Sequence, residues 1–193
     1  MNLYQAFRDS FCQVVSFAST SGYYFSDYTG WPTFSIVVLF VLLIIGGCSL
    51  STAGSLKVIR FIVFLKLIVR GLFKQIHPNS VKAVKINGRA ISAEKASETT
   101  SHIILYFFVL FFSFLFIGLN NFDMETTITS VIGLFSNAGP ALGVPGFAAD
   151  YSLFSDLSLA YMSFLMILGR LEMISILILF TRSFRKLNSP EQF

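Results

Sequence analysis

The sequence FSIVVLFVLLIIGGCSLSTAGSLKVIRFIVFLKLIVRGLF, residues Phe34 to Phe73, decides the fold because it is a long apolar run with a break inside it. As one straight helix these 40 residues would be about 60 Å long, whereas the hydrocarbon core of a bilayer is roughly 30 Å thick. The residues from Gly46 to Ser55 are small or polar, Leu50 excepted, and form helix poorly. We predict an irregular stretch there, which at membrane depth must be buried in protein or face a water-filled cavity. A simple hinge between a spanning helix and a surface helix is the alternative.

The composition of the whole chain is that of a membrane protein. Hydrophobic residues make up 54% and charged residues 12% of its 193 residues, too apolar for a soluble domain. Cys12 and Cys48 form no CxxC or Cys/His group, so we expect packing residues rather than a disulfide or a metal site. The formal charge of +4 would favour nucleic acid in a soluble protein, but the positions of the bases argue against that partner here.

The bases mark the cytoplasmic side. Nine of the 14 Lys and Arg residues lie between Lys57 and Lys95, where Glu94 is the only acid. Three more follow the last apolar run, whereas Asn120 to Asp156 contains four acids and no base. An excess of Lys and Arg is typical of cytoplasmic loops, so we predict a cytoplasmic C-terminus and an external acidic stretch.

Three membrane crossings are expected. The first is the broken run, the second is Ser101 to Leu119 and the third is Leu157 to Thr181. The second is entered from the basic side, so the N-terminus is predicted outside, in agreement with Arg8 as the only base before residue 57. The start of the chain lacks the features of a secretory signal peptide. We predict a multi-pass protein of the cell inner (plasma) membrane.

A short helix is predicted between the second and third crossings, from Asp123 to Asn137, with Asp123 as its N-cap. It is too short to cross a bilayer. The residues from Asn137 to Gly146, NAGPALGVPG, cannot continue it. This order describes a re-entrant loop, and an external loop with a surface helix is the alternative.

An internal repeat favours the re-entrant loop. Sliding the chain by 117 positions lays Val14–Gly22 over Val131–Gly139, and each copy is followed by an irregular stretch and a long apolar span. Three of the aligned pairs are identical: Val14/Val131, Ser19/Ser136 and Gly22/Gly139. The repeated unit is predicted as outer helix, pore helix, filter and inner helix, with its site at the interface between repeats.

The predicted fold is an all-α membrane protein with one complete unit and one unit that lacks its outer helix, so we expect a truncated fragment or a split gene product. Residues 1–73 hold the pore helix, filter and broken inner helix of the partial unit, and residues 74–100 form a basic cytoplasmic connection. Residues 101–186 form the complete unit, with its outer helix, re-entrant pore loop and inner helix, and residues 187–193 are a cytoplasmic tail.

The chemistry expected of the two loops is cation coordination. Glycine can adopt dihedrals closed to other residues, which turns successive carbonyls toward one axis to replace the water of an ion. The C-terminal ends of the pore helices add a negative potential. The residues before each glycine supply carbonyls, or hydroxyl and amide contacts that hold the loop. The predicted filter residues are Thr20, Ser21, Gly22, Asn137, Ala138 and Gly139.

From Phe11 to Lys186 the chain resembles the C-terminal part of the TrkH/KtrB-type potassium uptake subunits of the Trk/Ktr/HKT superfamily. The motifs that carry the resemblance are Gln13–Gly22 with Trp31 and Pro32, Gly46–Arg60, His77–Pro78, Ser136–Gly143, and Leu168–Glu172 before Phe180. The resemblance implies four units around one K+ pathway, of which this chain matches the third without its outer helix and the fourth. K+ would be the transported ion, with no bound cofactor.

The resemblance also implies a gate and a charge barrier. The loop under the filter would be the gate, with Gly46, Gly47, Ser51, Thr52 and Gly54 as its residues. Arg170 would project into the pathway and repel cations. Arg170 and Glu172 lie in an apolar span, where charges are costly and usually functional, but at i, i+2 they do not face each other. Lys57 has another partner, or it is a snorkelling interfacial lysine.

The chain departs from the family pattern at Leu50, Ser55 and Ala141, where glycine is usual. Such changes imply a less flexible loop with shifted gating, or a chain no longer under constraint for transport. The family also forms dimers and works with a cytoplasmic nucleotide-binding ring. The basic segment Arg70–Lys95 would face that ring, or lipid headgroups alone. His77 and His102 are expected at the membrane interface, without metal-ligand spacing.

Two functions remain open from the sequence. The first is K+ transport, which needs a second copy or the remaining N-terminal repeats because two filter loops cannot surround an ion. The second is a non-conducting membrane fragment with a structural or regulatory role, which binds full-length subunits or the cytoplasmic ring. An intramembrane serine enzyme is disfavoured because the nearest histidine to Ser49 and Ser51 in sequence, His77, falls in the basic cytoplasmic segment. We therefore predict no enzymatic activity.

Overall fold

The computed structural model describes residues 3–48, 51, 53–77, 83–86, 88–146, 150–171 and 173. The helices within them are α1 (Leu3–Ala18), α2 (Thr33–Ile45), α3 (Val58–Ile76), α4 (Ala93–Gly118), α5 (Met124–Phe135) and α6 (Asp156–Arg170). Several predicted features lie outside the described residues: Leu50 and Thr52 of the gate loop, Glu172, the part of the third span after Met173, and the tail 187–193.

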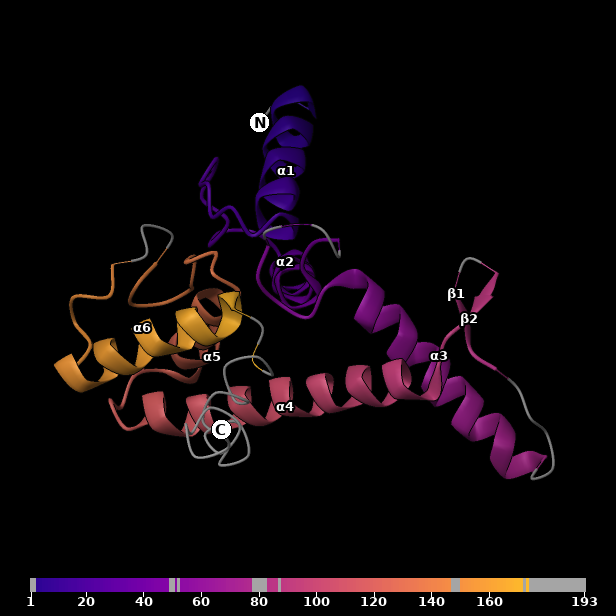
Figure 1. The fold of residues 1–193 in the computed structure, drawn as a ribbon. Coiled ribbons are helices and arrows are strands. Elements are labelled where there is room, and N and C mark those ends of the chain that lie inside the picture. Colours follow the sequence, from indigo (N-terminus) through magenta and orange to yellow (C-terminus); the bar gives the residue numbers. More distant parts are fainter. Residues whose placement is uncertain are drawn as a thin grey trace, which may run out of the picture.

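The long apolar run is broken where the sequence predicts it. Helix α2 ends at Ile45, and its C-cap Gly46 has the left-handed φ of 69° that suits glycine. Helix α3 begins at Val58, and its axis points in a different direction from that of α2, which Figure 1 shows end-on. The forty apolar residues therefore form two helices joined by a loop.

Helix α4 is the one helix in the described part of the chain that is long and apolar enough to cross a membrane. It has 26 residues, and its most apolar window has a mean hydropathy of 2.2. It begins earlier than the predicted span, inside the segment predicted as a connection, because Ser92 caps it: Ser92 Oγ accepts a hydrogen bond of 3.3 Å from the Lys95 backbone N–H.

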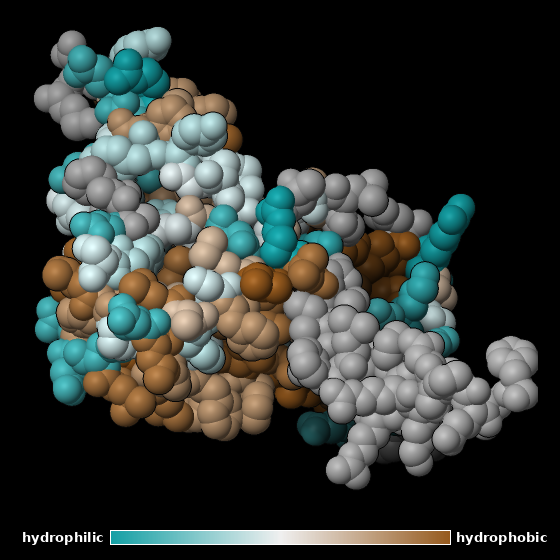
Figure 2. Space-filling view, turned by 60° about the vertical axis from the view of Figure 1, so that its left-hand side comes forward, coloured by the Kyte–Doolittle hydropathy of each residue, from teal (hydrophilic) through white to brown (hydrophobic). Residues whose placement is uncertain are grey.

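The outer face of α4 carries exposed aromatic and apolar side chains, among them Phe107, Phe108, Phe111, Phe112 and Leu115. Figure 2 shows broad hydrophobic areas over the lower part of the face that it presents. A large exposed apolar surface marks a membrane or protein contact. This surface agrees with the membrane location that the composition predicts.

Helix α5 lies inside the bundle, in contact with α2, α4 and α6. Nine of its 12 residues are buried, so it has no water-facing side. The ring of Phe135 at its end stacks on Tyr106 of α4 with centroids 4.7 Å apart. The alternative of a helix lying on the surface is therefore wrong. Asp123 is the N-cap as predicted, but its side chain makes no capping hydrogen bond.

The fold differs from the all-α prediction at one place. Strand β1 (Lys85–Ile86) pairs antiparallel with β2 (Arg89–Ala90) in the segment before α4. The two residues between the strands are Asn-Gly in the sequence, the dipeptide that tight hairpin turns favour, and Gly88 has a φ of 78°. The prediction missed this local turn signal because the segment was read only for its charge.

Candidate functional site

Two loops with the same backbone geometry follow α1 and α5. The helices end at Ala18 and Phe135, which are 117 positions apart, the offset of the sequence repeat. The same three turn hydrogen bonds follow each end: Ser19, Thr20 and Ser21 N–H donate to Val15, Phe17 and Ser16 O, and Ser136, Asn137 and Ala138 N–H donate to Ile132, Leu134 and Gly133 O. The two sequences therefore fold in the same way at this point.

Both loops use left-handed backbone at equivalent positions. Thr20 and Asn137 have φ values of 53° and 58°, and the glycines two residues later, Gly22 and Gly139, have 73° and 90°. Asparagine tolerates this region, whereas a β-branched threonine does so rarely and at a cost. The sequence predicted the special glycines but not the left-handed residue before them.

The two loops touch each other. A Cβ atom added to Gly22 would lie 2.1 Å from the carbonyl oxygen of Ala138, closer than any real contact allows. The backbone of the second loop therefore lies directly against the glycine of the first. This contact brings together residues that are more than a hundred positions apart, as the predicted filter requires.

Five carbonyl oxygens in these loops accept no hydrogen bond from the described residues: those of Thr20, Ser21, Gly22, Asn137 and Ala138. Thr20 is buried, Gly22, Asn137 and Ala138 are half-buried and Ser21 is exposed, and carbonyls without a protein donor are candidates for ion or water binding. Thr20 is 6% exposed, and its hydroxyl also has no partner within the described part.

The side chain of Asn137 holds the loop. Asn137 Nδ2 donates to the carbonyl oxygen of Met166 on α6 at 3.0 Å. The side-chain amide of Asn137 therefore links the loop to α6. The residues Ala138 and Gly139 are half-buried beside it.

The predicted gate loop packs against the second of these loops. The carbonyl oxygen of Leu43, near the end of α2, accepts hydrogen bonds from Ser55 Oγ at 2.6 Å and from Ser136 Oγ at 3.2 Å. A Cβ on Gly54 would lie 2.5 Å from the Ser136 carbonyl oxygen. The end of the gate loop therefore lies next to the residue that precedes Asn137.

Within itself the gate loop is folded tightly. A Cβ on Gly46 would be 2.8 Å from the Gly54 carbonyl oxygen, and one on Gly47 would be 3.0 Å from Ser51 Oγ. Ser51 Oγ accepts the backbone N–H of Ala53 at 3.1 Å. These predicted gate residues are thus in mutual contact.

Two departures from the family pattern have local physical explanations. Ser55 has a left-handed φ of 75°, which explains why glycine is usual there. The strain of about 1–2 kcal/mol is offset in part by its hydrogen bond to Leu43, since such bonds contribute about 1 kcal/mol. Ala141 has no positive φ and is fully buried, so that position needs no glycine.

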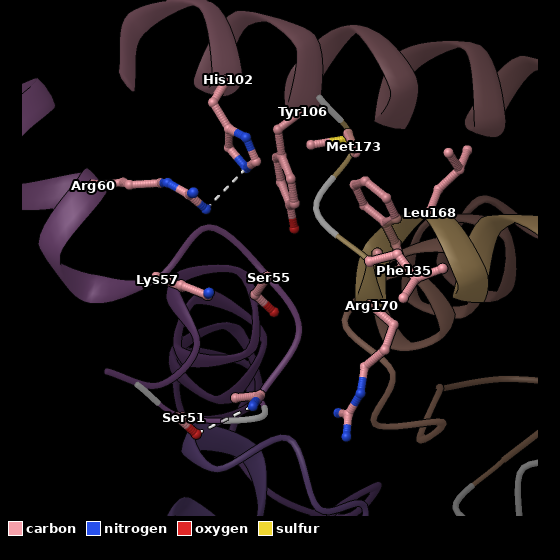
Figure 3. A pocket seen from close by; sticks show the side chains of 13 residues that line it. Ser51, Ser55, Lys57, Arg60, His102, Tyr106, Phe135, Leu168, Arg170 and Met173 are labelled. Atoms are coloured by element: carbon pink, nitrogen blue, oxygen red, sulfur yellow. Dashed lines mark hydrogen bonds between the residues drawn. The ribbon is translucent and has the colours of Figure 1, made fainter. Parts of the chain in front are cut away.

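A cavity of about 280 Å³ lies beside the gate loop, between α3, α4 and α6. Three basic side chains line it: Lys57, Arg60 and Arg170. Figure 3 shows Tyr106 reaching into this space from α4, with Lys57 and Ser55 on one side and Leu168 and Phe135 on the other. Among the described residues that line the cavity there are thus three bases and no acid.

The backbone around Arg170 packs closely. A Cβ on Gly169 would lie 1.9 Å from the Phe135 carbonyl oxygen, so α6 touches the end of α5 there. Arg170 follows this contact directly. The packing fixes Arg170 close to the end of α5, on the side of the cavity.

Several residues beside the cavity and the second loop were not expected from the sequence. His102 is only 3% exposed, and its Nε2 lies 3.4 Å from Arg60 Nη1. The hydroxyl of Tyr151 also bonds to Gly139 in the second loop, and that of Tyr28 bonds to Ala141, two residues further along. No spacing signal could have found these residues, because each contact joins segments far apart or irregular in structure.

We expect Gly54→Ala to destabilise the protein by about 1–3 kcal/mol, because its methyl group would press on the Ser136 carbonyl. Gly71→Ala on α3 is the matched control, since nothing lies within 4 Å of its Cβ position. Thermal unfolding in detergent should show a lower midpoint for Gly54→Ala alone. Equal midpoints would show that the gate loop does not press on the second loop.

The comparisons with known proteins agree on one family. The TrkH family, described as cation transport proteins, matches residues 1–189. The Trk system potassium uptake protein TrkH of Halomonas elongata is 34% identical over 180 residues, and that of Escherichia coli K12 is 34% identical over 177 residues. The crystal structure of the potassium transporter TrkH from Vibrio parahaemolyticus matches with a TM-score of 0.86 at 29% identity.

The match covers nearly all of this chain but only part of each relative. The Halomonas and Escherichia alignments cover 93% and 92% of this chain, and 37% and 36% of the relatives. The Vibrio structure covers 95% of this chain, and the match takes up 39% of that protein. This chain therefore spans somewhat more than a third of the length of the proteins it resembles.

Proposed function

Because the chain belongs to the TrkH family of cation transport proteins, we propose that it carries two of the filter loops of a K+ pathway across the inner membrane. Residues 20–22 form the first loop and residues 137–139 the second. The relatives that it matches are named as potassium uptake proteins, which are transporters and not enzymes. K+ is the ion, and its ligands are backbone oxygens.

One observation supports this proposed function more strongly than any other. Two loops with equivalent hydrogen bonds and equivalent left-handed residues meet at Gly22 and Ala138, and five of their carbonyl oxygens are left without a hydrogen-bond donor from the described residues. Rings of such oxygens replace the water of K+ in selective channels. The C-terminal ends of α1 and α5, which directly precede the loops, add a potential that favours a cation.

In the proposed arrangement α4, α5 and α6 are the outer, pore and inner helices of a complete unit. Helices α1, α2 and α3 are the pore helix and the broken inner helix of a second unit, with its outer helix supplied from elsewhere. Two loops cannot enclose an ion. A second copy of the chain or the remaining repeats must therefore complete the ring.

The gate and the barrier belong to the same proposal. The loop with Gly46, Gly47, Ser51 and Gly54 packs against the second filter loop and would open or close the path beneath it. Arg170 and Lys57 line the adjoining cavity and would raise the energy of a cation there. The C-terminus is proposed to be cytoplasmic, where a homodimer would meet a nucleotide-binding regulatory subunit.

The test is K+-dependent growth of a bacterial strain that lacks its own K+ uptake systems. The chain is produced alone and together with the missing repeats of a relative, and a full-length relative serves as the positive control. We expect growth at low K+ and uptake of Rb+, a K+ analogue, in at least one of these arms. Membrane insertion without uptake in either arm would contradict transport and leave the non-conducting role.

A further inference from the structure

Two tyrosine hydroxyls bind the backbone of the second filter loop and the chain that leaves it. Tyr151 Oη donates to the Gly139 carbonyl oxygen at 2.9 Å. Tyr28 Oη donates to the Ala141 carbonyl oxygen at 3.1 Å. Both tyrosines come from loops, one from before α2 and the other from before α6. The proposed ion ligands do not include these two bonded oxygens.

The hydrogen bond from Tyr151 orients the peptide group between Gly139 and Pro140. The peptide between Gly139 and Pro140 has no N–H, so no backbone hydrogen bond can orient it from that side. Gly139 also has a φ of 90°, in a region where glycine moves easily. The hydroxyl of Tyr151 keeps the Gly139 carbonyl in the protein wall, next to the unbonded carbonyls of Asn137 and Ala138.

Tyr28 links the two halves of the site. Its side chain is 0% exposed, and its ring meets that of Phe17, near the end of α1, edge to face with centroids 5.5 Å apart. Its hydroxyl reaches Ala141, 113 positions further along the chain. One rigid ring therefore spans from the first pore helix to the segment after the second loop, and so fixes the separation of the two loops.

We infer that Tyr151 and Tyr28 are positioning residues that set the preference of the filter for K+ over Na+. The inference rests on the proposed function. Selectivity of a carbonyl ring depends on its size and stiffness, and Na+ is the smaller ion. If either hydroxyl is removed, the loop can move inward and surround Na+ more closely. The oxygens themselves remain, so K+ still binds but discrimination falls.

The experiment compares three Tyr→Phe variants, each of which loses one hydroxyl oxygen. Tyr151→Phe and Tyr28→Phe act at the loop. Tyr161→Phe is the matched control, because its hydroxyl lies 2.8 Å from Ser113 Oγ between α4 and α6 and touches neither loop. Rb+ uptake is measured against increasing Na+ in the arrangement that conducts, with the chain alone or with the added repeats.

We expect the Na+ concentration that halves Rb+ uptake to fall about fivefold in Tyr151→Phe and Tyr28→Phe, the size expected for loss of one hydrogen bond. Tyr161→Phe should match the wild type. Thermal unfolding in K+ and in Na+ separates positioning from stability, since a purely structural role would lower both midpoints equally. If Tyr28→Phe does not reach the membrane, Tyr151→Phe decides alone.

The outcomes separate the two proposals. If Tyr151→Phe and Tyr28→Phe have the same Na+ sensitivity as Tyr161→Phe, the positioning role is wrong and the proposed function stands. A wild-type chain that takes up no Rb+ in either arrangement would overturn the proposed function, and the positioning role with it. Increased Na+ sensitivity in Tyr151→Phe and Tyr28→Phe but not in Tyr161→Phe would support both proposals.

Discussion

Gly22→Ala is expected to lower Rb+ uptake about a hundredfold. The new methyl group would lie 2.1 Å from the Ala138 carbonyl oxygen, and the φ of 73° adds strain for any residue with a Cβ. Left-handed strain costs about 1–2 kcal/mol and overpacking about 1–3 kcal/mol, and every 1.4 kcal/mol or so is a factor of ten. The displaced group is one of the proposed ion ligands, so the cost appears in ion binding.

The control for this prediction is Gly30→Ala, in the segment that follows the first proposed filter loop. Nothing lies within 4 Å of the Cβ position of Gly30, and its φ is not positive. Its uptake should equal that of the wild type. Normal uptake by a Gly22→Ala protein that reaches the membrane would show that the contact between the two loops does not form part of the ion path.

Arg170→Gln should have the opposite effect and raise Rb+ uptake about two- to thirtyfold. For a charge about 8 Å from the ion and an effective dielectric constant between about 20 and 80, the repulsion is roughly 0.5–2 kcal/mol. Glutamine keeps most of the length of the side chain and removes the charge. The cavity that Arg170 lines would then offer a lower barrier to a cation.

Arg8→Gln is the matched control for Arg170→Gln. Arg8 is exposed on α1 and pairs with Asp9 at 3.0 Å, far along the helix from the filter. Loss of its charge should leave uptake unchanged. Uptake that falls or stays constant in Arg170→Gln, with normal amounts of protein in the membrane, would show that Arg170 supports the fold rather than the barrier.

The parts of the fold that were predictable depend on local chemistry. The dense run of glycines and serines from Gly46 to Ser55 disfavours helix, so the loop between α2 and α3 followed from residue type. The repeat at 117 positions located the two turns at Ser19 and Ser136, because the same short pattern gives the same backbone hydrogen bonds. The surroundings of α5 did not follow, since a twelve-residue helix with apolar and hydroxyl side chains suits a buried or a membrane-surface position.

The parts that were not predictable depend on contacts between distant segments. Arg60 and His102 are 42 positions apart and meet only because α3 crosses α4. Nothing in the sequence distinguishes Tyr28 and Tyr151 from other loop tyrosines, although their hydroxyls bond to Ala141 and Gly139 in the structure. The hairpin of β1 and β2 was missed for another reason, since its Asn-Gly turn was present in the sequence and went unused.

The two hydrogen bonds that the Leu43 carbonyl oxygen accepts have a thermodynamic consequence. It accepts hydrogen bonds from Ser55 and Ser136, so displacement of one donor alters the support of the other. In the proposed K+ pathway, ion occupancy and loop position would then share a coupling free energy, which by linkage is the same in both directions. An effector that shifts the loop and changes K+ affinity by some factor would itself bind more or less tightly by that same factor when K+ is present.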